Sequence, residues 1–207
     1  MNILLVCGYR RTGKDTLYQT LIGDSDYKWN IYQHKDRQID DPFLVSSSYT
    51  RVSFADPLKS EASEVYGIPE YVPDSDKALK QFIHYDSGEL VSARDIYIEW
   101  GKYRRFQDQN YWCKQALKSI SSQNKSSIVI TDWRFINEGE FFLQNYENVL
   151  TIRIYRSDVP EPDINIESEH QLDTHLTDLL ITSTSTDFES VIARFPQYED
   201  YVLTHTL

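Results

Sequence analysis

The sequence predicts an α/β protein with a doubly wound, parallel, five-stranded sheet. Three apolar runs of strand length, "NILLV", "SSIVITD" and "DLLITS", are continuous, as is typical of strands buried on both faces. Helical stretches separate the apolar runs, and alternation of this kind implies parallel strands joined by crossover helices. The 207 residues suffice for one such domain with an inserted helical piece.

The first elements follow from the N-terminal third. "NILLV" is the first strand, and the residues from Lys14 to Ile22 read as a helix. Residues 23–50 are polar and aromatic without a clear period, so we expect a long loop or insertion there. "RVSFA" is the second strand. Asp56 is the expected N-cap of the next helix, with Pro57 at its first position and Gly67 at its end.

The remaining elements follow in order. Residues 76–82 and 92–120 read as helices, with Ser92 and Asn110 as caps and a break near Gln107. "SSIVITD" and "NVLTIRIYR" are the third and fourth strands, separated by a helix through "NEGEFFLQ". Residues 157–175 are acidic and contain proline, so we expect a mobile loop. "DLLITS" and "DFESVIARF" supply the last strand and helix, and the final twelve residues receive no element.

Composition excludes several classes of function. Lys and Arg number 21 against 32 acidic residues, which gives a net charge of −11. A polynucleotide ligand is therefore not expected, whereas a small phosphorylated ligand needs only a few local cations. No apolar run approaches the length of a membrane span. Cys7 and Cys113 form no metal or redox motif, and free cysteines suit a reducing compartment, so we expect a soluble, cytoplasmic protein.

The stretch "GYRRTGKDT" nearly matches the phosphate-binding pattern G-x-x-x-x-G-K-S/T. A phosphate-binding loop needs glycines for close backbone approach, a following helix N-terminus, and a lysine. Gly8, Gly13 and Lys14 meet these needs between a predicted strand and a predicted helix. The alternative is a glycine-containing turn with a solvated lysine. The position directly after the first strand favours the phosphate loop.

Two acidic residues, Asp15 and Asp132, are candidate ligands of a magnesium ion. Asp15 stands where Ser or Thr is expected, and Thr16 offers a hydroxyl at the next position. Asp15 either contacts the metal through water or caps the helix N-terminus, and the sequence leaves both readings open. Asp132 ends an apolar strand, where ligands collect in open α/β sheets. Its alternative role is to cap the next turn.

Arginine is concentrated in a few places in this acidic chain. Arg134 lies two residues beyond Asp132, and "WGKYRRF" interleaves cations with aromatic residues. Arginine is well suited to bidentate phosphate contacts. For any single arginine, the ordinary alternative to a phosphate contact is a surface ion pair. For Trp100 and Tyr103, the alternative to stacking on a base is packing in the core.

Four segments carry a family resemblance. "GYRRTGKDT", "RVSFADPLK", "ARDIYIEWGKYRRFQDQNYW" and "VITDWRFINE" resemble, in order and approximate spacing, the deoxynucleoside monophosphate kinases of phages and some large viruses. The resemblance covers residues 1 to about 195, except 23–50. It implies one P-loop kinase domain over residues 1–207, with a core of 1–22, 126–156 and 176–195. An acceptor-binding region of about 51–121 and a lid of about 157–175 complete it.

The resemblance also implies site residues, with ATP and Mg²⁺ as cofactors. The catalytic residues would be Lys14, Arg134, Arg105 and Asp132. The ATP-binding residues would be Gly8, Arg11, Thr12, Gly13, Lys14, Asp15, Thr16, Arg153 and Arg156. Those that bind the acceptor would be Ser53, Phe54, Lys59, Arg94, Trp100, Arg104, Arg105, Arg134 and Glu138. Mg²⁺ would meet Thr16, Asp15 and Asp132, directly or through water.

The implied activity is in-line transfer of the ATP γ-phosphoryl group to a deoxynucleoside 5′-monophosphate. The attacking phosphate oxygen is already ionised, so no general base is required, and His170 and His175 read as lid surface. Three alternatives stay open: a kinase for another phosphorylated metabolite, a ribonucleotide-preferring kinase, and a non-catalytic nucleotide-binding module. Small-molecule nucleotides are the expected partners, and a homodimer is the default assembly.

Overall fold

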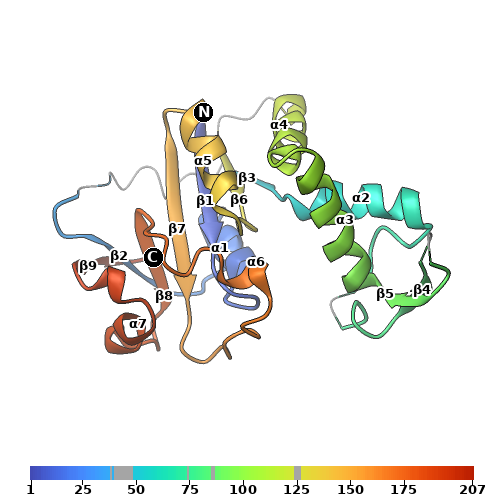
Figure 1. Cartoon of the computed structure of the whole chain (residues 1–207). Coiled ribbons are helices and arrows are strands. Elements are labelled where there is room, and N and C mark those ends of the chain that lie inside the picture. The colour runs from blue at the N-terminus through green and yellow to red at the C-terminus, as the bar shows by residue number, and fades with distance from the viewer. Residues whose placement is uncertain (38, 40–48, 74, 85–86, 124–126) are drawn as a thin grey trace. The chain divides into compact units, whose positions relative to one another are not determined.

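The computed structural model describes residues 1–37, 39, 49–73, 75–84, 87–123 and 127–207. The chain forms two compact units. The first comprises Met1–Val52 and Gln123–Leu207, and the second comprises Ser53–Ser122. Each unit has its own elements (Figure 1) and is described by itself.

The first unit is built on a seven-stranded sheet in the order β3-β6-β1-β7-β8-β2-β9 (Figure 1). The first five strands in that order are parallel to one another, and β2 runs antiparallel to both β8 and β9. The fold is therefore mixed α/β with a mostly parallel sheet, as the apolar runs predict. The strands are β1 (Asn2–Cys7), β2 (Trp29–His34), β3 (Tyr49–Val52), β6 (Ser127–Ile130), β7 (Val149–Tyr155), β8 (Leu179–Ser183) and β9 (Tyr201–Thr206).

The predicted count of five strands is wrong, because two further strands extend the sheet. The five parallel strands correspond to the five predicted ones, but β3 begins two residues before the predicted "RVSFA", and the last residue of that stretch, Ala55, begins a helix. β2 lies within residues 23–50, where a loop was expected, and β9 lies within the unassigned tail. Trp29 and Ile31 are fully buried from β2, and Tyr201 is buried from β9. Residues 38 and 40–48 of the expected loop lie outside the described residues.

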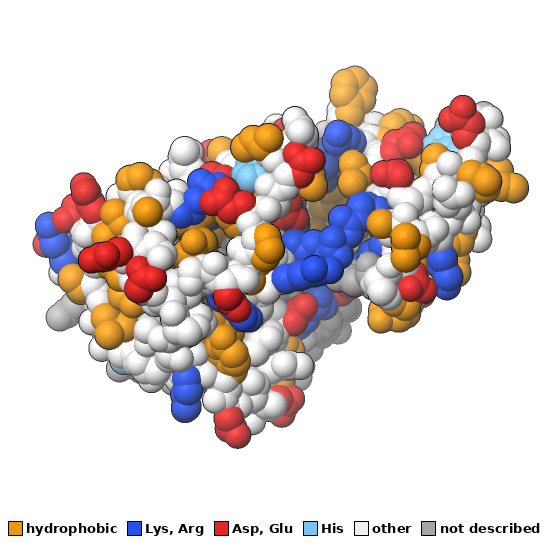
Figure 2. All heavy atoms as spheres, turned by 90° about the horizontal axis from the view of Figure 1, so that it is seen from below, with side chains coloured by type: hydrophobic (Ala, Val, Ile, Leu, Met, Phe, Trp, Pro, Cys, Tyr) orange, Lys and Arg blue, Asp and Glu red, His pale blue; other side chains and the backbone are white. Residues whose placement is uncertain are grey.

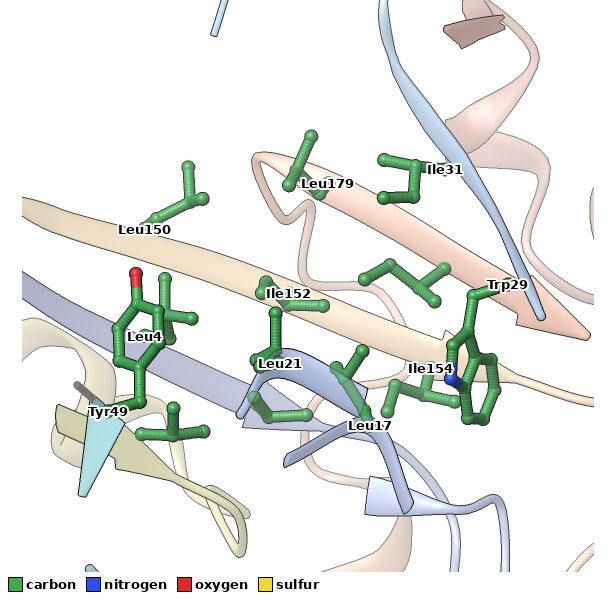
Figure 3. Packing of buried hydrophobic residues seen from close by; sticks show 13 residues of the cluster. Leu4, Leu17, Leu21, Trp29, Ile31, Tyr49, Leu150, Ile152, Ile154 and Leu179 are labelled. Carbon is green, nitrogen blue, oxygen red and sulfur yellow. The ribbon is translucent and has the colours of Figure 1, made fainter. Parts of the chain in front are cut away.

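Helices cover both faces of this sheet. Leu17 and Leu21 of α1 (Lys14–Leu21) pack in one cluster with Ile152 and Ile154 of β7 (Figure 3). Val191 of α7 (Phe188–Arg194) belongs to the cluster on the opposite face. The other helical elements of the unit are α5 (Ile136–Asn145), α6 (Glu167–His170) and the short 3-10 helix η2 (Pro196–Tyr198).

The second unit contains three helices and a short hairpin. These are α2 (Ala55–Tyr66), α3 (Ala93–Gln107), α4 (Tyr111–Gln123) and the hairpin of β4 (Gln81–Ile83) with β5 (Leu90–Ser92). The helix predicted over residues 76–82 is wrong, because turns and then β4 occupy this segment. The predicted break after Gln107 is confirmed.

The helix caps of the second unit follow the sequence in part. Ser92 caps α3, since its Oγ accepts a hydrogen bond from the Asp95 amide at 3.2 Å. Gly67 ends α2 with φ of 63°, as predicted. Asp56 is not the N-cap of α2: the helix begins at Ala55, two residues before the predicted first position, and its N-cap is Phe54. The Ala55 amide donates to the Ser53 hydroxyl at 3.1 Å, and Asp56 lies in the first turn of the helix.

The surface combines both signs of charge. On the face shown in Figure 2, Lys and Arg side chains stand beside Asp and Glu side chains, with hydrophobic side chains scattered among them. The net charge of −11 therefore does not make this face uniformly acidic. Within the described part of the chain, no helix is long and apolar enough to cross a membrane.

Candidate anion-binding site at the end of the first strand

The loop between β1 and α1 has a backbone that two glycines make possible. Gly8 has φ of 144°, and a Cβ there would lie 2.5 Å from the Ile154 carbonyl oxygen. Gly13 has φ of 96°, and its Cβ would lie 2.8 Å from a ring carbon of buried Trp29. Residues with side chains rarely adopt these angles. The two glycines of the sequence pattern therefore stand at the two positions of the loop where a side chain would not fit.

The middle of the loop is held by a tight turn. Thr12 is buried and bonds to the Tyr9 carbonyl through both its amide, at 3.3 Å, and its hydroxyl, at 2.9 Å. Arg11 has φ of 68°, in the left-handed region, which is unusual for a residue with a side chain. A strained arginine in a loop is typical of a functional segment, because strain persists only where the surroundings enforce it.

Lys14, the first residue of α1, folds back over the loop. Its Nζ donates to the carbonyl oxygens of Gly8 at 2.8 Å and Tyr9 at 2.7 Å. Burial, and then the positive charge of Arg134, lower the Lys14 pKa to about 8, against the opposing charge of Glu169. A buried lysine whose pKa is lowered by a neighbouring arginine forms, with that arginine, a site that an anion would stabilise.

The segment after β6 brings two predicted residues to the same loop. The Trp133 amide donates to the Val6 carbonyl at 3.2 Å, so this segment runs alongside the end of β1. Asp132 is partly buried there, and its charge acts on Lys14. Arg134 follows, with its Nη1 2.5 Å from Glu169 Oε1. The structure thus brings Lys14, Asp132 and Arg134 together, as the two strand ends predict.

Glu138 has a structural role in this arrangement. Its side chain is buried, and Oε2 accepts from the amides of Arg134 at 2.9 Å and Phe135 at 3.1 Å. These bonds cap the N-terminus of α5 and fix the backbone that carries the Arg134 side chain. The acceptor contact that the resemblance implies for Glu138 stays a prediction.

Glu169 is a residue of the site that the sequence did not single out. It belongs to α6, and its Oε2 accepts a hydrogen bond from the Arg10 amide at 3.0 Å. Its other carboxylate oxygen is the one that pairs with Arg134. "ESEHQLD" contains several acidic residues, and nothing in their order distinguishes Glu169 from Glu167 except the fold that brings one of them to the loop.

A second group of charges lies on the far side of Tyr9. The Tyr9 hydroxyl donates to both carboxylate oxygens of Asp173, at 3.0 and 2.9 Å. Arg194 reaches Asp173 at 2.8 Å, and His170 Nδ1 lies 2.8 Å from the same carboxylate. Burial opposes a charge on His170, but Asp173 outweighs it and raises the His170 pKa. Burial and Asp173 together raise the pKa of Tyr9.

Arg153 is a buried residue that binds the backbone of the segment after α6. It is almost completely buried, with Nε 3.1 Å from the Tyr198 hydroxyl, and Nη2 donates to the carbonyls of Leu172 and His175. It also lines one small pocket with Gly8 and Arg134. Its hydrogen bonds go to protein groups, so its role in the structure is to hold residues 172–175. Arg156 instead forms a two-point pair with Asp158, at 3.0 and 2.5 Å.

The candidate metal ligands lie at the start of α1 and after β6. Asp15 pairs with Arg51 at 3.1 Å, whereas Thr16 lies partly buried in the first turn of α1. Among the described residues, no three His, Cys, Asp or Glu side chains are grouped to hold a metal ion. Magnesium is commonly held by one or two carboxylates together with substrate phosphates, and the assignment of Asp132 and Thr16 to such a site stays a prediction.

In the second unit, two predicted residues, Trp100 and Arg104, meet at Glu61. Its carboxylate accepts from Trp100 Nε1 at 3.2 Å, from Arg104 Nε at 3.0 Å and from the Tyr111 hydroxyl at 2.5 Å. The Arg104 guanidinium also lies over the Trp100 ring, 4.6 Å from its centre. Trp100 and Arg104 therefore join α2, α3 and α4 through Glu61.

The other predicted acceptor residues are spread over the same unit. Arg105 lies against Gly101, where a Cβ would stand 3.4 Å from its Nη1. Lys59 is 3.8 Å from Asp56, and Phe54 is buried. Arg94 Nε is buried and has no hydrogen-bond partner within the described residues. The Tyr97 hydroxyl, one turn along α3, is also buried and has no hydrogen-bond partner within the described residues.

No protein-family model matches this chain, and no curated protein sequence matches it significantly. At the carboxyl ends of β1 and β6, the Arg10 amide and the Arg134 guanidinium both reach the Glu169 carboxylate, and the charges of Arg134 and Glu169 act on Lys14. Such a combination can bind a multiply charged anion.

Proposed function

We propose that the chain is a P-loop kinase that transfers the γ-phosphoryl group of ATP to deoxynucleoside 5′-monophosphates. One observation carries the proposal: the Gly8–Thr16 loop leads into a helix, and Lys14 and Arg134 flank it at the ends of adjacent parallel strands. In open α/β sheets ligands bind at the carboxyl ends of the strands. The deoxynucleoside monophosphate is proposed as the acceptor because four sequence segments resemble these kinases in their order.

Each part of the loop has a task in this proposal. The loop amides other than that of Thr12, which donates to the Tyr9 carbonyl, would face the β- and γ-phosphates, and Lys14 would exchange its carbonyl contacts for phosphate oxygens. Arg134 would stabilise charge that spreads over the transferring group. Mg²⁺, held by Thr16 and Asp132 with the phosphates, would neutralise charge on the β- and γ-oxygens.

For the acceptor, the proposal draws on the second unit. Arg94 Nε and the Tyr97 hydroxyl are buried polar groups without a hydrogen-bond partner within the described residues, and such groups are uncommon in folded proteins. A phosphate or sugar oxygen would satisfy both. Lys59 and Arg105 are the further cations that the proposal assigns to the acceptor.

The chemical step needs no covalent intermediate. An oxygen of the acceptor phosphate attacks the γ-phosphorus, a new P–O bond forms, and the bond to the β-phosphate oxygen breaks to release ADP. The nucleophile is ionised at neutral pH, so no proton has to be removed. Catalysis would come from positioning and from the charges of Lys14 and Arg134.

A coupled assay for ADP release tests the proposal. Mg·ATP is supplied with dGMP, dTMP, dCMP, dAMP or GMP in turn, using the wild type and Lys14→Met. We expect ADP release that depends on a deoxynucleotide and falls at least about 100-fold in Lys14→Met, the scale of losing one electrostatic contact to the transition state.

Lys28→Met is the matched control, because Lys28 is an exposed lysine of the same unit. It should retain wild-type activity. ADP release that ignores the acceptor, or that survives in Lys14→Met, would show that this loop does not perform acceptor-dependent phosphoryl transfer.

A further inference from the structure

The carboxylate of Glu169 already occupies the donors that a phosphate group would use. Its Oε2 accepts from the Arg10 amide of the loop at 3.0 Å, and its Oε1 lies 2.5 Å from Arg134 Nη1. Only 10% of the side chain is exposed. A carboxylate presents oxygen acceptors and a negative charge, as a phosphate does, and charge-assisted bonds of this kind are the strong ones.

The charge of Glu169 also reaches the third cationic group of the site. It raises the Lys14 pKa, opposing the effects of burial and of Arg134. In the absence of a ligand, one side chain therefore serves a loop amide, an arginine and a lysine. A phosphate group that enters the same position meets both occupied donors and a like charge.

We propose that Glu169 is an internal competitor for the phosphate site, displaced when a polyphosphate binds. A single phosphate offers too few contacts to displace it, whereas a triphosphate engages the whole loop. Glu169 thus determines selectivity for polyphosphates over inorganic phosphate. This inference rests on the proposed function for the identity of the ligand, a nucleoside triphosphate.

The surrounding segment is suited to such a displacement. On the C-terminal side of Glu169, Leu172 is buried with its carbonyl bonded to Arg153, and Asp173 is fixed by Tyr9 and Arg194. On the N-terminal side, Ile164 is 75% exposed. The contacts beyond Leu172 can therefore persist while Glu169 and the exposed residues before it move away from the loop.

The test compares Glu169→Gln with Glu167→Gln. Both changes remove one negative charge from α6, but Glu167 is exposed and contacts only Gln171 among the described residues, at 3.1 Å. Binding of tripolyphosphate and of inorganic phosphate is measured by calorimetry without Mg²⁺, and binding of ATP is measured with and without it. We expect Glu169→Gln to bind tripolyphosphate at least about tenfold more tightly and inorganic phosphate measurably, while Glu167→Gln stays within twofold of wild type.

Several outcomes would overturn the inference. If the wild type binds tripolyphosphate and Glu169→Gln binds it no more tightly, Glu169 is not a competitor, and the proposed function is unaffected. If Glu169→Gln weakens only Mg·ATP and leaves tripolyphosphate unchanged, Glu169 serves the metal instead. If wild type and variant bind neither anion nor ATP, the proposed function fails and the inference fails with it.

A second variant guards against misfolding. Glu169→Asp keeps the charge but shortens the side chain, so it cannot span both the Arg10 amide and Arg134. Provided that thermal unfolding stays close to wild type, tripolyphosphate should bind to it with an affinity between those of wild type and Glu169→Gln. Weaker binding than wild type would contradict competition, because a shortened competitor cannot improve its hold on the loop.

Discussion

At the scale of single residues, Gly13 shows how the loop depends on its backbone. Its φ of 96° excludes ordinary side chains, and its missing Cβ leaves room for the Trp29 ring, which is fully buried and cannot move aside. The sequence pattern predicts the need for glycine here. It does not predict Trp29, because that contact comes from a strand expected to be a loop.

We predict that Gly13→Ala lowers the free energy of unfolding by about 2–3 kcal/mol, from left-handed strain of about 1–2 kcal/mol and the clash with Trp29. Gly23→Ala is the matched control, because Gly23 has φ of 82° and nothing within 4 Å of the added Cβ. Gly23→Ala should lower the free energy of unfolding only by the left-handed strain of about 1–2 kcal/mol. Urea unfolding of both variants measures the difference, and equal losses would refute the role of Trp29.

Lys14 predicts a pH dependence of ATP binding. Its pKa in the free protein is about 8, lowered first by burial and then by Arg134, and a bound triphosphate would raise it. Below pH 8 the lysine is already charged, so this group leaves the affinity unchanged. Above pH 8 binding must take up a proton, and the affinity should fall by up to about tenfold per pH unit.

Calorimetry at pH 7, 8 and 9, in two buffers with different ionisation enthalpies, measures this proton uptake. Lys14→Arg is the control, because arginine stays charged over the whole range. The variant should lose the part of the slope that belongs to this residue. A slope that persists unchanged in Lys14→Arg would assign the titration to another group.

At the scale of elements, β9 completes the sheet through one buried side chain. Tyr201 packs against Tyr198 with ring centres 4.8 Å apart, and its hydroxyl donates to the Thr177 carbonyl. The next residue, Val202, is 47% exposed. β9 lies at the edge of the sheet beside β2, and Tyr201 is its one buried residue.

Tyr201→Ala should therefore lower the free energy of unfolding by about 3 kcal/mol or more, because it leaves a cavity and an unsatisfied buried carbonyl. Val202→Ala should change it by less than about 0.5 kcal/mol. Chemical unfolding of the two variants measures the ratio. Similar effects would mean that β9 contributes little to the core.

The elements that sequence reasoning missed share a physical cause. β2 and β9 combine buried residues with polar ones, so their apolar runs are interrupted. β4 covers three residues, and its Ile83 is exposed, so it has no buried face to reveal it. β1, β6 and β8 were predictable because burial on both faces makes their apolar runs continuous.

At the scale of the whole molecule, the predicted parts of the site are those set by local sequence. Gly8, Gly13 and Lys14 occur within one motif, and Asp132 and Arg134 follow one strand. Contacts between distant segments could not be predicted in this way. Glu169 and Asp173 join the loop across about 160 residues, and only the order of the strands brings them there.

The assignments of arginines show the same limit. Arg153 and Arg104 match a phosphate-binding pattern by position, yet Arg153 binds buried carbonyls and Arg104 binds Glu61. Arginine serves packing and ion pairs as readily as ligands, and the choice depends on which acceptors the fold places beside it. Sequence position alone does not contain that information.

The most direct test of the central claim is a titration with Mg·ATP followed by backbone amide NMR. If the Gly8–Thr16 loop binds the phosphates, the largest shifts should fall on the amides of this loop, with Gly13 and Lys14 foremost, and Lys14→Met should abolish them. If millimolar Mg·ATP shifts only amides elsewhere in the chain, or none at all, the loop is not a nucleotide site.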